Sequence, residues 1–262
     1  MINIALENCP RDARLYLFRG ILYRRLKDFT AAIEDLVQAV ELSEEEEVRA
    51  QAEAGEQKEE SGSVEEEVRF QVVLTYNDFA VQCFSRGLYA EATLLLHKAV
   101  EQEKGQAGLY LNRGDCFFKQ GEWCFALADY QQAEEMMRPD DPAVRLRLAI
   151  LHNTLGSLCF QDGCFQEAAD MFSLAVQYDP AAGRYYESRS KAFRKLLDLE
   201  GARRDFICML ILDPTNEELP PMLMNLFPGC SAADVLSSPA GQAVRAQLMD
   251  SIQACSSSSD RQ

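Results

Sequence analysis

The stretch Leu148–Pro180, LAILHNTLGSLCFQDGCFQEAADMFSLAVQYDP, indicates the fold class because it holds two amphipathic helical patterns that are separated by the Gln-Asp-Gly at residues 161–163. On each side of this break, apolar residues recur every three or four positions, which is the spacing of a helix that buries one face. Asp179 and Pro180 end the second pattern, because proline cannot continue a helix. The stretch predicts an antiparallel helical hairpin.

Small residues in this stretch have a steric explanation. Gly156 and Ala168 are predicted to lie on facing sides of the two helices, where only a small side chain lets the backbones approach, and Phe172 packs beside them. The same spacing recurs four more times in the chain, at Gly20 and Ala32, Ala80 and Ala92, Gly114 and Ala126, and Ser190 and Ala202. Gly114 follows Ala80, and Ser190 follows Gly156, in strict 34-residue phase.

The glycine, alanine, aromatic and proline positions of this pattern resemble the tetratricopeptide repeat, a helical hairpin of about 34 residues. The resemblance covers residues 1–218 and implies an all-α, right-handed superhelical solenoid, with hairpin 1 at residues 13–42 and hairpins 2–5 at residues 69–218. It also implies a scaffold or adaptor that binds a partner peptide or helix on the concave side. A regulatory or targeting subunit of an enzyme complex is the alternative.

Two segments interrupt the repeat. Residues 43–68 hold eleven Glu against Arg49 and Lys58, with few apolar residues, and are predicted to be a disordered or frayed-helix insertion. They form either a solvated loop or a functional arm that competes for a basic surface. Eight extra residues around Asp141 and Pro142 predict a lengthened first helix of the fourth hairpin, from Pro142 to near Phe160.

The two ends of the chain depart from the repeat as well. Residues 1–12 match the second helix of a truncated hairpin, so we expect a shortened product of a longer array or a start that packs on a partner. Residues 219–255 are predicted to form capping helices that cover the last hairpin. The polar tail at residues 256–262 is predicted to be disordered.

The first helix of each hairpin should line the concave groove. Asparagine amides there can bond a peptide backbone, and Arg and Lys at both ends favour a ligand with an apolar centre and acidic flanks. Alternatively, these cations only balance nearby carboxylates. The candidate groove residues are Arg14, Arg24, Arg25, Asn77, Asn112, Phe118, Asn153, Phe160, Arg184, Lys191 and Arg194.

Composition limits the classes of partner and the compartment. The net charge of −16 argues against nucleic acid or an anionic membrane as the main ligand, and no apolar run approaches a membrane span. Nine cysteines without a C-x-x-C pair fit a reducing compartment, and the first residues lack a secretory signal. We expect a cytoplasmic protein, with cytoskeletal or ciliary association as a further option.

No catalytic, cofactor-binding or metal site is expected. The two histidines are far apart in sequence, and phosphate-loop, nucleophile-elbow and zinc-ligand patterns are absent from the sequence. Some tetratricopeptide repeats hold chaperone C-terminal carboxylates with a clamp of Lys, Asn and Arg. The matching positions here are Leu17, Ile21, Gly108 and Asn112, so that clamp is not expected.

Overall fold

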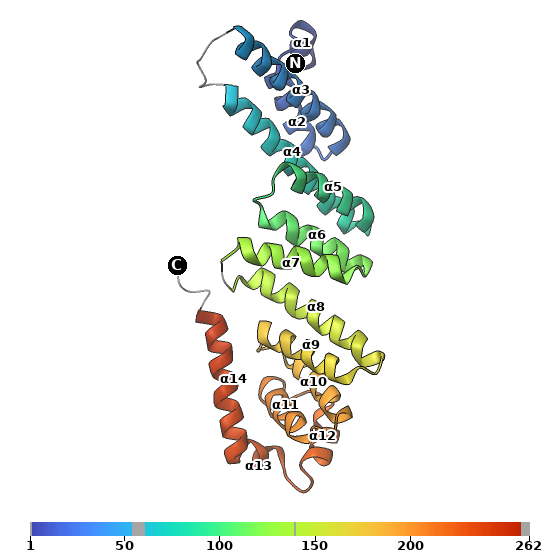
Figure 1. Ribbon diagram of the computed structural model, residues 1–262, viewed down its shortest axis with the longest axis vertical. Coiled ribbons are helices and arrows are strands. Elements are labelled where there is room, and N and C mark those ends of the chain that lie inside the picture. The colour runs from blue at the N-terminus through green and yellow to red at the C-terminus, as the bar shows by residue number, and fades with distance from the viewer. Residues whose placement is uncertain (1, 54–60, 139, 258–262) are drawn as a thin grey trace. The chain divides into compact units, whose positions relative to one another are not determined.

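The computed structural model describes residues 2–53, 61–138 and 140–257, and every regular element in those ranges is an α-helix (Figure 1). The chain divides into two compact units, Met1–Asp129 and Tyr130–Gln262. The boundary between them falls within α7 (Trp123–Met136).

The first unit begins with the short helix α1 and continues with helical hairpins. Hairpin 1 is α2 with α3, hairpin 2 is α4 with α5, and hairpin 3 is α6 with α7. Their bounds are α1 (Ile2–Asn8), α2 (Ala13–Arg25), α3 (Phe29–Glu53), α4 (Ser61–Ser85), α5 (Tyr89–Gln102) and α6 (Ala107–Gln120).

The second unit holds hairpin 4, which is α8 with α9, and hairpin 5, which is α10 with α11, followed by three C-terminal helices. Their bounds are α8 (Pro142–Gln161), α9 (Phe165–Tyr178), α10 (Gly183–Lys195), α11 (Leu199–Leu212), α12 (Leu219–Leu226), α13 (Ala232–Ser237) and α14 (Pro239–Ser257).

The small residues of the repeat lie at the closest approach of each pair of helices. A Cβ added to Gly20 would lie 2.8 Å from Leu36 Cγ, and one added to Gly156 would lie 2.7 Å from the Phe172 ring. In hairpin 5 the Ser190 hydroxyl donates to the Ala202 carbonyl oxygen at 3.4 Å, in a completely buried seam. All nine predicted packing residues are buried, namely Gly20, Ala32, Ala80, Ala92, Gly114, Ala126, Gly156, Ala168 and Ala202.

The turn between the two helices of each hairpin has one conformation throughout the chain. A backbone N–H just past the first helix donates to a carbonyl five residues earlier, as from Leu88 to Cys83 at 2.9 Å and from Asp198 to Phe193 at 2.9 Å. This is the Schellman pattern, which needs one residue with positive φ. That residue is glycine in three hairpins and another residue in two, at Lys27, Gly87, Gly121, Gly163 and Leu197.

The lengthened helix predicted for hairpin 4 is confirmed. Helix α8 has 20 residues, whereas the equivalent α10 has 13. The side chain of Asp141 accepts a hydrogen bond from the Ala143 N–H, and Pro142 occupies the first helical position. Both features stabilise a helix start.

Of the two forms predicted for residues 43–68, disordered or frayed helix, the described ends of the segment are helical. Helix α3 continues to Glu53, and α4 already begins at Ser61, while residues 54–60 lie outside the described ranges. The reason is burial, because Val64 and Val68 of α4 pack against Leu36 and Ala39 of α3. Hairpin 1 therefore extends past residue 42, and hairpin 2 begins before residue 69.

The C-terminal region forms three helices. Met222 and Leu226 of α12 are buried in one cluster with Phe206 and Met209 of α11, and Leu248 of α14 joins the same cluster. In Figure 1, α14 (red) turns back along the side of α11. Because α14 ends at Ser257, the first two residues of the predicted disordered tail are helical, and residues 258–262 lie outside the described ranges.

Candidate peptide-binding groove

The candidate groove residues lie on the first helices of the hairpins, which are neighbours within each unit. In the first unit α4 contacts both α2 and α6, and in the second unit α8 contacts α10. The first unit carries Arg14, Arg24, Arg25, Asn77, Asn112 and Phe118. The second unit carries Asn153, Phe160, Arg184, Lys191 and Arg194.

An apolar depression lies between α4 and α6. It encloses about 160 Å³ and is lined by Val81 and Phe84 of α4, by Asn112 and Cys116 of α6, and by their neighbours. The side chain of Val81 is 52% exposed, although it is aliphatic. This volume is below the roughly 300–1,000 Å³ of a small-molecule site and suits one apolar side chain of a peptide.

Asn112 lines this depression and is bonded to Asn77 of α4. The Asn112 side-chain amide donates to Asn77 Oδ1 at 2.8 Å, so the two groove candidates are bonded to each other across α4 and α6. The pair fixes the orientation of both amides. Each amide keeps further donor or acceptor capacity that a peptide backbone could use.

Arg24 is engaged by neighbours in the first unit and is not a free cation of the groove. Its guanidinium donates to Asp78 at 2.8 Å and to Gln71 Oε1 at 3.2 Å, so it joins α2 to α4. Arg14 and Arg25 on the same helix are exposed, and in the described ranges neither side chain has an ion-pair partner.

The cations of α10 likewise include some that bond to a neighbouring side chain and one that does not. Lys191 donates to Glu187 at 2.6 Å, and the guanidinium of Arg184 donates to the hydroxyl of its neighbour Tyr185 at 2.7 Å. Arg194 is exposed and has no ion-pair partner among the residues that the structure describes. The idea that these cations balance nearby carboxylates thus holds for Arg24 and Lys191, and the remaining exposed arginines stay available.

The aromatic candidates form a repeated internal contact. Phe118 lies edge-on to Trp123 with ring centroids 5.1 Å apart, and Phe160 lies edge-on to Phe165 at 5.2 Å. Each contact joins the end of a first helix to the start of its second helix, so these rings support the hairpin. Asn153 keeps a buried Oδ1 without a partner in the described part of the chain.

Three arginines that sequence reasoning missed make the strongest polar contacts of the repeat. These are Arg19, Arg113 and Arg189. Each guanidinium donates two hydrogen bonds to the carboxylate of an aspartate sixteen residues later, on the second helix of the same hairpin. These bidentate pairs are Arg19 with Asp35, Arg113 with Asp129 and Arg189 with Asp205, with N–O distances between 2.7 and 3.0 Å.

The third donor of each arginine reaches backward by the same sixteen residues, to the helix that precedes the hairpin. Arg19 Nη1 donates to Asn3 at 3.0 Å, Arg113 Nη1 to His97 Nδ1 at 3.2 Å, and Arg189 Nη1 to Ser173 at 3.2 Å. Each guanidinium also lies over the tyrosine three residues before it, at Tyr16, Tyr110 and Tyr186. We name each three-helix set an arginine clasp.

The clasps coincide with the phase of the repeat. The clasp of Arg113 joins hairpins 2 and 3, and that of Arg189 joins hairpins 4 and 5. These two junctions are the ones in strict 34-residue phase. Hairpins 2 and 4, which follow the two insertions, carry Phe79 and Leu155 at the arginine position. The sequence signal is Tyr-x-x-Arg followed by Gly or Ser, with Asp sixteen residues after the arginine.

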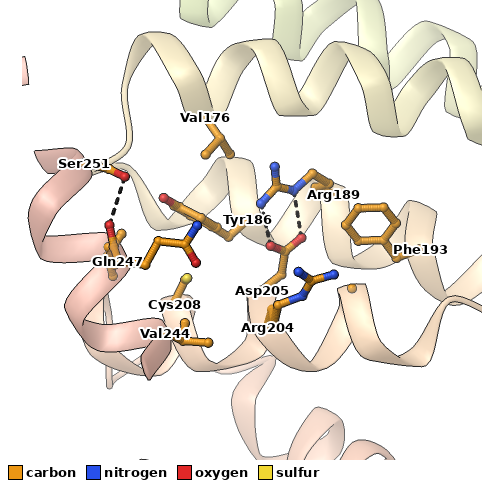
Figure 2. Close-up of a pocket in the computed structure, with 12 residues that line it drawn as sticks. Val176, Tyr186, Arg189, Phe193, Arg204, Asp205, Cys208, Val244, Gln247 and Ser251 are labelled. Carbon is orange, nitrogen blue, oxygen red and sulfur yellow. Dashed lines mark hydrogen bonds and ion pairs between the residues drawn. The ribbon is translucent and has the colours of Figure 1, made fainter. Parts of the chain in front are cut away.

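A cavity of about 320 Å³ lies beside the clasp of hairpin 5 (Figure 2). Arg189, Asp205 and Cys208 form its wall on the hairpin side, and Val244 and Gln247 of α14 face them. Burial raises the pKa of Asp205, and the two N–H bonds from Arg189 oppose that rise. Burial also raises the pKa of the Cys208 thiol to about 12, so this thiol is not activated as a nucleophile.

Metal and membrane features can be stated for the described residues. No group of three or more His, Cys, Asp or Glu side chains in those ranges is arranged to hold a metal ion. Within the same ranges, no helix combines the length and the apolar character that crossing a bilayer requires. All nine cysteines are free thiols.

The paired helices, their small-residue seams and their common turn form an α-solenoid with the fold of tetratricopeptide repeats. The family model described as "Tetratricopeptide repeat" matches residues 13–46, which begin with α2 and end within α3. Repeats of this class are in general non-catalytic modules for protein interaction.

The chain is similar to proteins called Tetratricopeptide repeat protein 16. It is 39% identical to the one from Homo sapiens over 94% of this chain and 27% of that protein, and 36% identical to the one from Mus musculus over 94% of this chain and 30% of that protein. The chain therefore spans less than a third of the length of these relatives.

Solved structures of repeat proteins also align with the chain. YrrB, described as a TPR protein with an unusual peptide-binding site, aligns with a TM-score of 0.48 at 17% identity, covering 86% of this chain and 98% of that chain. A crystal structure of MamA aligns with a TM-score of 0.45 at 17% identity, covering 79% of this chain and 94% of that chain.

Proposed function

We propose that this chain is a protein-interaction scaffold that binds an extended partner peptide along the first helices of its hairpins. The observation that carries the proposal is the apolar depression between α4 and α6, with exposed Val81 beside the bonded amides of Asn77 and Asn112. An apolar side chain of the peptide fills the depression, and the amides bond its backbone.

Acidic residues of the peptide are proposed to flank this apolar anchor. Arg14 and Arg25 of α2 are exposed on the neighbouring helix of the same unit, so they can meet carboxylates without first breaking an ion pair. Arg24 would have to leave Asp78 and Gln71, which disfavours it as a ligand contact. The chaperone-tail clamp is not part of this proposal, because Leu17 and Ile21 stand at its positions.

A reducing, cytoplasmic setting is part of the same proposal. The free state of the nine thiols supports it, since oxidising compartments favour disulfides. Association with a cytoskeletal or ciliary assembly is the finer form of the proposal, and proximity labelling from this chain in ciliated cells tests it.

The groove is tested by selecting peptides from a random phage-displayed library against the chain. Val81→Glu should weaken the selected peptides by about tenfold, because a carboxylate would enter the apolar depression. Leu94→Glu is the matched control, since Leu94 is 66% exposed on the second helix of the same hairpin. Equal losses in both variants, or a loss only in the control, would contradict a site at α4 and α6.

A further inference from the structure

Two of the five hairpin turns share a sequence that the other three lack. Hairpin 1 turns through Arg-Arg-Leu-Lys-Asp at residues 24–28, and hairpin 5 turns through Arg-Lys-Leu-Leu-Asp at residues 194–198. We name these two segments the basic-leucine turns. One lies in each unit of the chain.

The turn geometry does not explain this sequence. Lys27 and Leu197 have φ values of 62° and 61°, in the left-handed region where Gly87, Gly121 and Gly163 stand in the other hairpins. The closing hydrogen bonds are the same, for example from Asp28 to Tyr23 at 3.0 Å and from Glu122 to Phe117 at 2.9 Å. Glycine would therefore complete the basic-leucine turns as well, and without steric strain.

Packing does not explain it either. Leu197 is 82% exposed and Leu26 is 75% exposed, so neither leucine contributes much apolar burial to the fold. Leu199, at the start of α11, is 49% exposed beside Leu197 in sequence. Leu197 has a left-handed backbone conformation that costs free energy, and its side chain buries little apolar surface to offset that cost. This combination points to a role for the residue in binding another molecule.

The charges around the leucines indicate the chemistry of a partner. Arg194 and Lys195 are exposed next to Leu196 and Leu197, and in the described ranges neither has an ion-pair partner. The nearby Asp198 forms no ion pair with them in the described ranges, and its carboxylate accepts the Gly201 N–H at 2.9 Å as the helix cap of α11. In hairpin 1, the exposed cations Arg25 and Lys27 flank Leu26, whereas in hairpin 5 both cations precede the leucines.

We propose that the basic-leucine turns are docking points for an acidic amphipathic helix of a partner protein. The turns contribute no residue to the lining of the apolar depression between α4 and α6, and they share the candidate groove cations Arg25 and Arg194. The Leu or Phe side chains of the partner helix cover the exposed leucines, and its Glu or Asp side chains pair with the exposed cations of each turn. Of these cations, Lys195 also lies 6.0 Å from the centroid of the Phe165 ring. The chain's net charge of −16 repels such a helix at long range, but salt at physiological strength screens charges beyond about 8 Å. The exposed cations of each turn then dominate the electrostatic interaction with the helix at short range.

The test titrates the whole chain with a 16-residue amphipathic peptide of Glu, Leu and Phe by isothermal calorimetry. In the Val81→Glu chain, whose apolar depression is blocked, we expect two peptides bound per chain, with affinity that falls as salt rises. Arg194→Gln/Lys195→Gln should reduce the number bound to one. The matched control, Arg86→Gln/Lys119→Gln, removes two exposed turn cations beside glycine turns and should leave the number at two.

Leu197→Gly separates a binding role from a structural one. The affinity of the hairpin 5 site for the peptide should fall by about fivefold, because apolar contact is lost. The melting temperature should rise by about 2 °C, because glycine removes the backbone strain of a leucine with positive φ. A variant that loses stability shows that Leu197 serves the fold. Equal binding of a Lys-for-Glu peptide, unchanged stoichiometry in the 194/195 variant, or concentration-dependent self-association through these turns would each overturn the proposal.

Discussion

Hairpins 4 and 5 occupy the same unit and follow each other in strict 34-residue phase, yet one uses apolar and the other ionic side chains at equivalent positions. Hairpin 5 holds Arg189 and Asp205 at the positions where hairpin 4 holds Leu155 and Met171. Their second helices both have 14 residues, and their turns have the same left-handed residue position. The small-residue seam and the turn therefore fix the hairpin, and the interior pair is free to be ionic or apolar.

The largest effect should come from breaking the ionic pair on one side only. Asp205→Ala leaves the Arg189 guanidinium buried without its carboxylate, and we expect a loss of about 3 kcal/mol in the free energy of unfolding. Urea unfolding followed by circular dichroism measures it. The double variant Arg189→Leu/Asp205→Met, which copies the residues of hairpin 4, should recover most of the lost free energy of unfolding. A double variant as unstable as the single one would show that hairpin 5 requires the ion pair.

A smaller effect is expected from making the seam of hairpin 4 resemble that of hairpin 5. Gly156→Ser introduces a Cβ that would lie 2.7 Å from the Phe172 ring, so we expect a loss of about 2 kcal/mol, measured by urea unfolding. Ser190→Gly is the reciprocal control in hairpin 5 and should cost only about 1 kcal/mol of helix propensity. Equal costs would show that the seam of hairpin 4 is not tighter.

The smallest effect concerns pH. His152 in hairpin 4 is equivalent to Tyr186 in hairpin 5, is buried, stacks on Tyr178 at 5.7 Å, and burial lowers its pKa. As pH falls through about 6.5, His152 gains a proton in the unfolded chain while it stays neutral in the folded chain. The free energy of unfolding should therefore decrease by about 1 kcal/mol by pH 5.5. Thermal melts at pH 7.5 and 5.5 measure this. His152→Phe should flatten the dependence; an unchanged slope would exclude His152 as its source.

The repeat itself could be predicted from sequence because its determinants are local. Gly156 and Phe172 lie at a fixed spacing within one hairpin, and a cap of Asp141 before Pro142 marks the start of α8 without any knowledge of the tertiary structure. Helical period and turn residues carry this information along a single segment of chain.

The remainder depends on contacts between segments. The sequence could not decide between disorder and frayed helix for the acidic segment, because its helical ends are ordered by Val64 and Val68 packing on α3. Arg24 was predicted to face a ligand, but it pairs with Asp78 at a distance of 54 residues in sequence. The clasp aspartates were missed since no helical period relates positions sixteen apart on different helices. The packing of α14 against α11 was likewise not predicted, because no residue pattern within α14 indicates which helix it contacts.

The arginine clasps also set how the array should respond to force. Each clasp holds three consecutive helices, so pulling one hairpin away from its clasped neighbour must break charge-assisted hydrogen bonds at the same moment as the apolar seam. Hairpins 1 and 2 have no clasp between them among the described residues, and Arg24 joins them through Asp78 and Gln71 instead. Under force, the hairpins joined by a clasp should therefore yield together, hairpin 2 with 3 and hairpin 4 with 5.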